Sequence, residues 1–264
     1  MTSFVPPKKG EVEVPTVATL TQGAVARPLN PIFGRNGLID KYFYFSMSLL
    51  VAAIVAWGFS YTVNANLFHP AIPRPIILYF HAAAFSGWLA FFILQTALVR
   101  THNVRWHRTL GWFGAALGSA MVMLGCTTSV IMARFDTYRL HMPGQDAFLI
   151  VPFTDMLAFG TCFGLAVLWR RKPEFHRRLI FVGTCVLLDA AFGRIGSLFD
   201  RNLFYACLDG VILLGVVRDL LVNRSIHKVY LVALPVLMVS QYFIIQIWRG
   251  APSWWLGIAH RIMA

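Results

Sequence analysis

The chain has 264 residues, of which 58% are hydrophobic, 14% aromatic and only 13% charged, and its formal net charge is +12. About 25% of the residues of an ordinary soluble domain are charged, so this composition excludes a water-facing globule, a disordered chain, a coiled coil and a collagen-like fibre. It predicts an all-α protein, a polytopic bundle of membrane helices.

Residues 1–40 are rich in Pro, Val and Thr and show no helical periodicity. We expect them to form a largely extended tail, without the apolar core of a cleavable signal peptide. Further along the chain, the four cysteines form no CxxC pair and all fall in apolar stretches, which argues against a disulfide framework and a thiolate zinc site. We interpret them as small buried hydrophobic residues.

Seven apolar segments follow the tail, each close to the 20 or so residues that a helix needs to cross a bilayer. They are too long and too continuous for barrel strands. They cover 42–64, 76–99, 109–133, 147–169, 179–199, 203–222 and 229–248. Residues 41–250 are therefore expected to form a seven-helix transmembrane domain. Residues 251–264, with Trp254 and Trp255, are expected to form a short interfacial helix.

The distribution of positive charge predicts the orientation of these segments. With Arg218 grouped with the connection after the sixth segment, 16 of the Lys and Arg residues fall on the side of the N-terminus and 6 on the other side. The positive-inside rule then places the N-terminus in the cytoplasm and the C-terminus outside. Topology accounts for the basic residues, so we expect a lipid bilayer and no nucleic acid as partner. The loop 134–146 is the longest external connection and a candidate lid.

A weak internal repeat places histidines at the cytoplasmic starts of helices. The pattern [WF]-H-R-x-L-x-x-x-G occurs at 106–114 and again at 175–183, and His227-Lys228 is a shorter echo of it. Interfacial anchoring by the basic and aromatic residues is one interpretation. The other is a cofactor site, in which His107, His176 and His227 would provide axial ligands to a haem b.

Ionisable side chains inside the segments form a second candidate site. Their positions along the helices place them in one layer in the outer half of the bilayer. Three carboxylates face one arginine there, so either a carboxyl is protonated or a cation is bound. We predict a divalent metal site from His81, Asp155 and Asp209, and an ion-pair or proton site from Asp189 and Arg194. Arg194 is expected to reach Asp155 or Asp209. A purely structural ion pair, with the other carboxyls facing water, is the alternative.

Several motifs in residues 76–195 follow a common pattern. His81, Gly87 and Gln95 precede His107-Arg108 and Gly111, giving H…G…Q…HRxxG. This resembles a family of uncharacterised bacterial multi-span membrane proteins, a domain of unknown function, and the resemblance implies a location in the bacterial inner (plasma) membrane. There is also a distant likeness to membrane cytochromes b, although a stacked pair of mid-span histidines is missing.

These features lead to three functional hypotheses. The first is a metal- or haem-binding membrane protein of redox type. The second is a proton-coupled transporter of small solutes that uses the same carboxylates. The third is a non-catalytic accessory subunit of a membrane complex, for which other subunits or further copies of this chain would be partners. The sequence favours the first, and it does not name a reaction or decide whether the protein is an enzyme.

Overall fold

The computed structural model describes residues 1–3 and 37–264, and every regular element in them is helical, which confirms the all-α class. Residues 4–36 of the extended tail expected at 1–40 lie outside the described residues. In chain order the elements are α1 (Leu38–Ser60), the π-helical turn η2 (Asn64–Phe68), α2 (Ile76–Arg100), α3 (Val104–Tyr138), α4 (Gln145–Phe148), α5 (Ile150–Leu168), α6 (Pro173–Val186), α7 (Asp189–Phe192), α8 (Gly196–Asp200), α9 (Phe204–Asn223), α10 (Lys228–Gly250) and α11 (Ser253–Met263).

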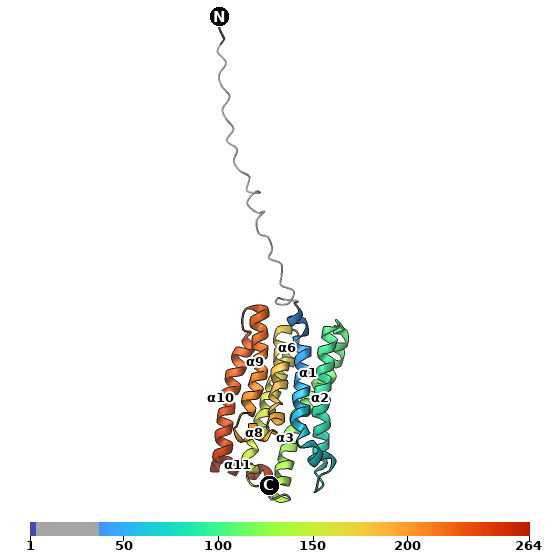
Figure 1. Cartoon of the computed structure of the whole chain (residues 1–264), viewed down its shortest axis with the longest axis vertical. Helices are drawn as coiled ribbons and strands as arrows, with labels where there is room; N and C mark the ends of the chain where they lie inside the picture. Colours follow the sequence, from blue (N-terminus) through green and yellow to red (C-terminus); the bar gives the residue numbers. More distant parts are fainter. Residues whose placement is uncertain (4–36) are drawn as a thin grey trace.

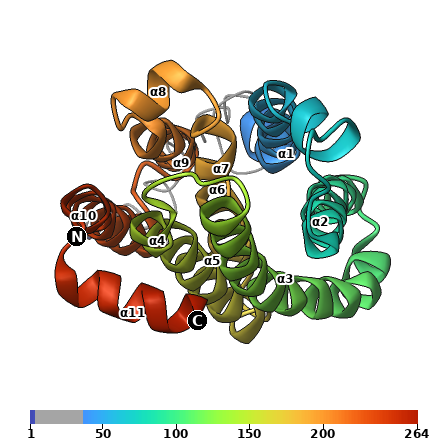
Figure 2. The ribbon, with the colours of Figure 1, turned by 90° about the horizontal axis from the view of Figure 1, so that it is seen from below.

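The long helices run side by side as an up-and-down bundle (Figure 1). The start of α1 and the connections α2–α3, α5–α6 and α9–α10 lie at one end, which we call the upper end; α11 lies at the other, the lower end. Seen from below, α6 lies inside the bundle and α11 lies across its end (Figure 2). Helix α6 contacts α1, α5, α9 and α10, so its side chains form much of the core.

Five helical segments in the described residues are long and apolar enough to cross a membrane: α1, α2, α3, α4 with α5, and α10. The chain is therefore a helical membrane protein. The sixth expected segment corresponds to α9, which has 20 residues but carries Asp209, Arg218 and Asp219. The fifth corresponds to α6, which has only 14 residues.

The uninterrupted helix expected at 179–199 is wrong, because the chain breaks twice there. Helix α6 ends at Val186, α7 is a single turn, and Ile195 is extended with φ −91° and ψ 102° before α8 begins. Gly193 and Gly196 lower the helix propensity of this stretch. Packing also contributes, because Gly58 of α1 lies directly against the backbone of Ala191. The breaks place Asp189 at the start of the single turn α7 and Arg194 on the irregular chain between α7 and α8.

Helix α3 is longer than the segment expected at 109–133. Its 35 residues correspond to about 52 Å, well over the roughly 30 Å of a bilayer's hydrocarbon core. The candidate lid at 134–146 is thus shorter than expected, since its first part continues α3 to Tyr138. Arg74 supports this extension through an ion pair with Asp136 at 3.2 Å.

Helix α11 occupies the C-terminal stretch where the sequence predicts a short helix. The indole N–H of the buried Trp255 donates to the carbonyl of Ala147 at 3.0 Å, and His260 Nε2 lies 2.8 Å from a carboxylate oxygen of Asp146. Arg134 of α3 donates to the carbonyl of Ala264 at 3.1 Å. These contacts attach α11 to the lower end of the bundle, while its depth in a membrane stays a prediction.

The two adjacent tryptophans of α11 allow a matched test of this attachment. Trp255→Phe removes the hydrogen bond to Ala147 and is expected to weaken docking of α11 by about 1 kcal/mol. Trp254, which is more than half exposed, is the control as Trp254→Phe. Limited trypsin cleavage after Arg261 should be about fivefold faster in Trp255→Phe and unchanged in Trp254→Phe. Equal cleavage rates would show that this bond does not hold α11.

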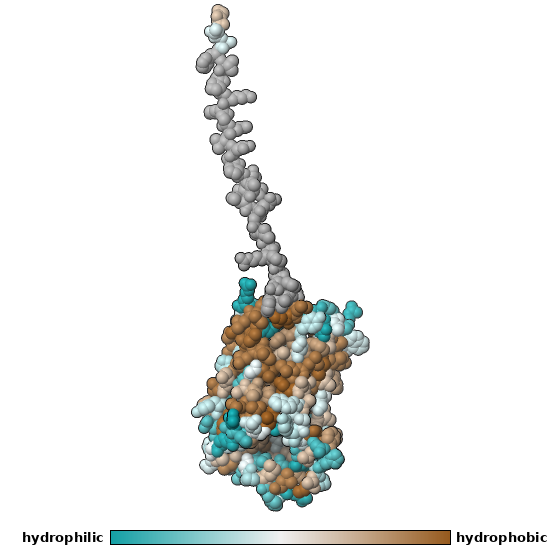
Figure 3. Space-filling view, in the orientation of Figure 1, coloured by the Kyte–Doolittle hydropathy of each residue, from teal (hydrophilic) through white to brown (hydrophobic). Residues whose placement is uncertain are grey.

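The surface around the bundle is strongly apolar. Figure 3 shows a hydrophobic belt over the upper and middle parts of the visible face, with polar residues gathered toward the lower end. Large apolar side chains that are more than half exposed include Phe80, Met123, Leu157, Val232, Met238 and Phe243. A soluble monomer rarely exposes so much contiguous apolar surface, whereas lipid chains would cover it.

Candidate functional site

Two buried carboxyl groups, Asp155 on α5 and Asp189 on α7, lie next to each other, close enough to interact directly. The two residues are only 6% and 9% exposed. An ionised carboxylate only accepts hydrogen bonds, so a hydrogen bond between the two would need a proton on one of them. Two negative charges so close together in apolar surroundings would also repel each other strongly. The pair is therefore able to hold one proton inside the bundle.

Tyr205 of α9 lies beside this carboxyl pair, within electrostatic range of both Asp155 and Asp189. The residue is 4% exposed, and its hydroxyl has no hydrogen-bond partner in the described part of the chain. Asp155, Tyr205 and Gln241 line a mostly apolar cavity of about 450 Å³ between α5, α6, α9 and α10. A few converging polar groups in an apolar cavity are typical of ligand sites.

Arg194 does not form the ion pair that the sequence predicts with Asp155 or Asp209. Its Nε donates to the hydroxyl of Thr62 at 3.1 Å, and its Nη1 donates to the carbonyl of Ala190. The guanidinium also lies over the ring of Phe59, 3.9 Å from its centre. Arg194 follows α7 directly, and its side chain reaches the end of α1 and not α5 or α9.

His81 lies on the same side of the bundle as Arg194, whose charge acts on it. Its ring stacks on Phe85, with 4.1 Å between ring centres, and its Nδ1 is buried without a hydrogen-bond partner among the described residues. Arg194 also acts electrostatically on Asp189. His81, Arg194 and the carboxyl pair therefore form one polar layer, although no direct hydrogen bond links His81 to a carboxylate in the described residues.

Asp209 of α9 has a different partner from the other carboxylates. Its Oδ1 accepts a hydrogen bond from Gln241 Nε2 of α10 at 3.1 Å. Asp155 is paired with Asp189, so the structure does not show the predicted metal-ligand set of His81, Asp155 and Asp209 as a cluster. No group of three His, Cys, Asp or Glu side chains in residues 1–3 and 37–264 is arranged to hold a metal ion. The metal site stays a sequence prediction without geometric support.

Comparison with protein-family models, with curated proteins and with solved structures finds no match. The resemblance to bacterial multi-span membrane proteins and to membrane cytochromes b therefore stays an expectation, and the function has to be argued from the site.

Two of the three histidines of the repeat, His107 and His176, lie together at the upper end. The rings of His107 and His176 have centres 6.2 Å apart at an interplanar angle of 78°. His176 Nδ1 lies 2.9 Å from the carbonyl oxygen of Ala166. The nearby Gln95 is buried, and neither polar atom of its amide finds a partner in the described part of the chain. His227 contacts Phe175 instead, with ring centres 4.6 Å apart.

His227 has a structural role at the start of α10. Its Nδ1 accepts a hydrogen bond from the backbone N–H of Val229 at 3.2 Å, which caps the helix. Burial and the positive charge of Arg178 lower the pKa of His227, so the neutral ring that this hydrogen bond requires predominates at neutral pH. A neutral ring that accepts at Nδ1 has its proton on Nε2, so His227 in this state has no free nitrogen for the predicted haem iron.

The sequence analysis missed a charged network at the upper end. Asp219 of α9 accepts from Arg178 Nε at 2.9 Å, from Arg178 Nη2 at 2.5 Å and from Arg218 Nη1 at 2.7 Å. Arg218 also pairs with Asp40, and Arg178 with Glu174 at 2.6 Å. Arg178, Arg218 and Asp219 are almost completely buried. Grouping Arg218 with a connection was wrong. The sequence did contain a signal for this network, since Asp219 directly follows Arg218 within the apolar segment 203–222.

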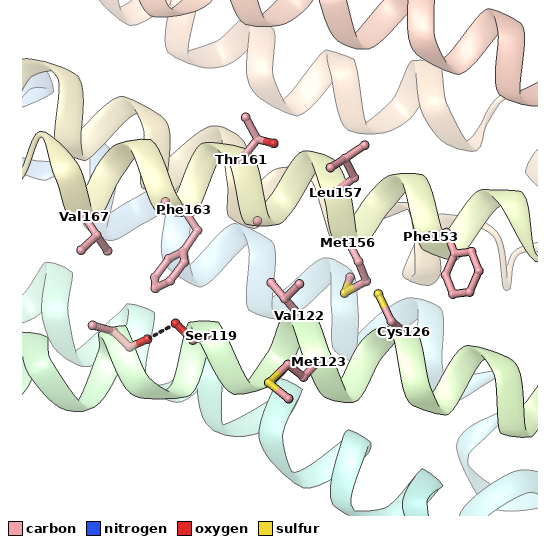
Figure 4. Close-up of a pocket in the computed structure, with 13 residues that line it drawn as sticks. Ser119, Val122, Met123, Cys126, Phe153, Met156, Leu157, Thr161, Phe163 and Val167 are labelled. Carbon is pink, nitrogen blue, oxygen red and sulfur yellow. Dashed lines mark hydrogen bonds between the residues drawn. The ribbon is translucent and has the colours of Figure 1, made fainter.

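A second, more open groove lies between α3 and α5 on the outer surface (Figure 4). Small and apolar side chains line it, including Ala115, Val122, Met156 and Gly160, together with the thiol of Cys126. Ser119 uses its hydroxyl within α3, donating to the carbonyl of Ala115 at 2.9 Å. No histidine or carboxylate lines this groove, so it is not the candidate site.

Proposed function

We propose that this chain is a seven-pass protein of the bacterial inner membrane, with a cytoplasmic N-terminus, that couples proton binding at Asp155 and Asp189 to the movement of a small, largely apolar solute. The two neighbouring, buried carboxyl groups carry the proposal. Membrane-buried carboxyls that share a proton are the usual carriers in proton-coupled transport. Substrate sites of transporters also lie at discontinuous helices, and the break between α6 and α8 supplies one.

The pair works as follows in this proposal. With one proton shared, the pair has a single negative charge, which Arg194 balances from a distance. Arrival of a second proton neutralises the pair, and loss of the shared proton leaves two repelling charges. Either change alters the attraction between α5 and α7. Because α7 is one turn of helix between two breaks, it is able to shift without moving the rest of the bundle.

Infrared spectroscopy of the full chain in detergent tests the proton site directly. We expect a C=O stretching band of a protonated carboxylic acid at neutral pH, which Asp155→Asn and Asp189→Asn each remove or shift. Asp209→Asn is the matched control, since Asp209 has an amide and not a carboxyl as its partner. Absence of the band in the unmodified protein at neutral pH would contradict the shared proton.

Transport is tested in proteoliposomes with an imposed pH gradient. Tracer amounts of labelled octyl sulfonate, octyltrimethylammonium and octyl glucoside serve as anionic, cationic and neutral probes. The gradient should stimulate accumulation of at least one probe, with a loss of at least about tenfold in Asp155→Asn and Asp189→Asn but not in Asp209→Asn. No stimulation with any of the three, or the same stimulation in all variants, would overturn the proposal.

Haem binding is a second candidate, which rests on the His107–His176 pair. His107 and His176, whose ring centres are 6.2 Å apart, are the two imidazoles that would hold a haem iron, which would supply redox chemistry. The contact of His176 Nδ1 with Ala166 is the kind that orients a ligating ring. Neither of the two described cavities is lined by these rings. The histidines would therefore provide ligands for the iron, but neither cavity provides space beside them for the haem ring. A Soret band in purified protein that His107→Ala and His176→Ala each abolish would support haem; a colourless preparation would exclude it.

A further inference from the structure

The cavity beside the carboxyl pair is an elongated groove, which we call the α5–α10 groove. Its walls come from α5 and α10 and its floor from α6 and α9. Most of the side chains that line it are aliphatic or small, among them Ala158, Leu165, Leu179, Leu208, Ala233 and Leu237. Such a lining offers hydrogen bonds only at a few places, so it selects an apolar chain over a polar solute.

The length of the groove is close to that of a lipid chain. It follows α10 from Lys228 to Ile244, which corresponds to about 24 Å of helix, and α5 from Thr154 to Trp169, about 22 Å. One acyl chain of a phospholipid occupies half of the hydrocarbon core, about 15 Å. The groove is therefore long enough for one complete alkyl chain and a head group.

The upper mouth of the groove is positively charged. Lys228 lines it, and the neighbouring connections carry Arg171, Lys172 and Arg224. No ion pair in the described part of the chain involves any of these four. The acidic groups of the charged network, which also lies at the upper end, are paired with its own arginines. An anion at this mouth would thus find cations that have no internal partner.

We propose that the α5–α10 groove binds a single-chain anionic amphiphile, with its head group at Lys228 and its chain running past Ala233 toward Gln241 and Asp155. The inference rests on the proposed function, for which it names the class of solute. The end of the chain lies beside the carboxyl pair and excludes water from it. Occupancy and proton exchange are coupled in this way, because a dry pair exchanges its proton more slowly than a wet one.

Binding is measured on the full chain in nanodiscs of zwitterionic phosphatidylcholine, without a pH gradient. Labelled hexadecyl sulfonate should bind at least about tenfold more tightly than hexadecyltrimethylammonium, which has the same chain. Lys228→Gln should reduce this preference about three- to tenfold. Equal affinities for the two probes would overturn the assignment of an anionic head group.

Filling the groove tests the path of the chain. Ala233→Phe places a ring in the lining and should weaken binding of hexadecyl sulfonate at least about tenfold. Val239→Phe is the control, because Val239 lies on the same helix, is exposed and does not line the groove. Unchanged binding in Ala233→Phe would show that the chain lies elsewhere.

A measurement without substitution covers the case in which Ala233→Phe does not fold. Cys162 lines the α5–α10 groove and Cys126 lines the open groove of Figure 4. Hexadecyl sulfonate should slow alkylation of Cys162 by a small thiol reagent at least about threefold and leave Cys126 unaffected. Equal protection of both thiols, or of neither, would contradict the proposal.

The two proposals fail separately. If Asp155→Asn binds hexadecyl sulfonate as the unmodified protein does, but the pH gradient drives no accumulation in any variant, the groove is a lipid site and proton coupling is wrong. If the carboxylic acid band and gradient-driven accumulation are present but hexadecyl sulfonate neither binds nor protects Cys162, proton coupling stands and the solute class is wrong.

Discussion

Replacing Asp219 by alanine is expected to lower the free energy of unfolding of the detergent-solubilised protein by about 3–5 kcal/mol. Asp219 is fully buried and accepts hydrogen bonds from both Arg178 and Arg218. Its removal leaves two buried guanidinium groups without this counter-charge. The cost comes mainly from leaving these buried charges with only the partly exposed Glu174 and Asp40 as partners, and not from the loss of contact area. Denaturant unfolding followed by circular dichroism measures the difference.

Glu174→Gln is the matched control for Asp219→Ala. Glu174 also pairs with Arg178, but its side chain is about half exposed, so the expected loss is at most about 1 kcal/mol. The double variant Asp219→Leu with Arg178→Met should be more stable than Asp219→Ala, because it removes one of the stranded charges together with the carboxylate. A loss for Asp219→Ala no greater than that for Glu174→Gln would show that the network does not stabilise the fold.

Replacing Gly58 by alanine is expected to cost about 1–3 kcal/mol through overpacking. A Cβ at this position would meet the carbonyl oxygen, carbonyl carbon and Cα of Ala191, and two of these contacts are 2.7 and 2.8 Å. These are backbone atoms, so no side-chain rotation relieves the clash. Helix α7 would have to move away from α1, which would also displace Asp189.

Gly87→Ala in α2 is the control with the opposite sign. No atom lies within 4 Å of a Cβ built there, so the substitution should stabilise the helix by about 0.5–1 kcal/mol. Thermal unfolding of both variants under the same detergent conditions gives the comparison, and the carboxylic acid band should shift only in Gly58→Ala. A Gly58→Ala protein as stable as Gly87→Ala would mean that the close contact between α1 and α7 does not constrain the fold.

The fifth apolar segment shows where prediction from sequence reached its limit. Hydrophobicity over 179–199 was sufficient to place the segment in the bundle. It did not indicate that the helix stops at Val186, because glycines and alanines are common inside membrane helices. The break arises where α7 packs against Gly58, a contact between residues more than 130 positions apart. Arg194, which directly follows α7, likewise bonds Thr62 and not the predicted Asp155 or Asp209.

The candidate sites were predictable to different degrees. The repeat in the sequence identified His107 and His176, whose rings do lie beside each other. Asp155 and Asp189 were both recognised as buried, but their direct pairing depended on the break. Arg218 and Asp219 were not recognised as a site, since a charge near the end of a segment usually faces water or head groups.

The sequence by itself determined that this protein resides in a lipid bilayer and not in water. Long apolar segments and scarce charges make a helical membrane protein, because only helices satisfy their own backbone hydrogen bonds in such segments without regard to neighbours. The tertiary structure alone decided which charges are paired, which carboxyl groups lie together and where a helix is broken. Those outcomes depend on distances of a few ångströms between segments far apart in the chain, and at low dielectric such distances determine the energy of a charge.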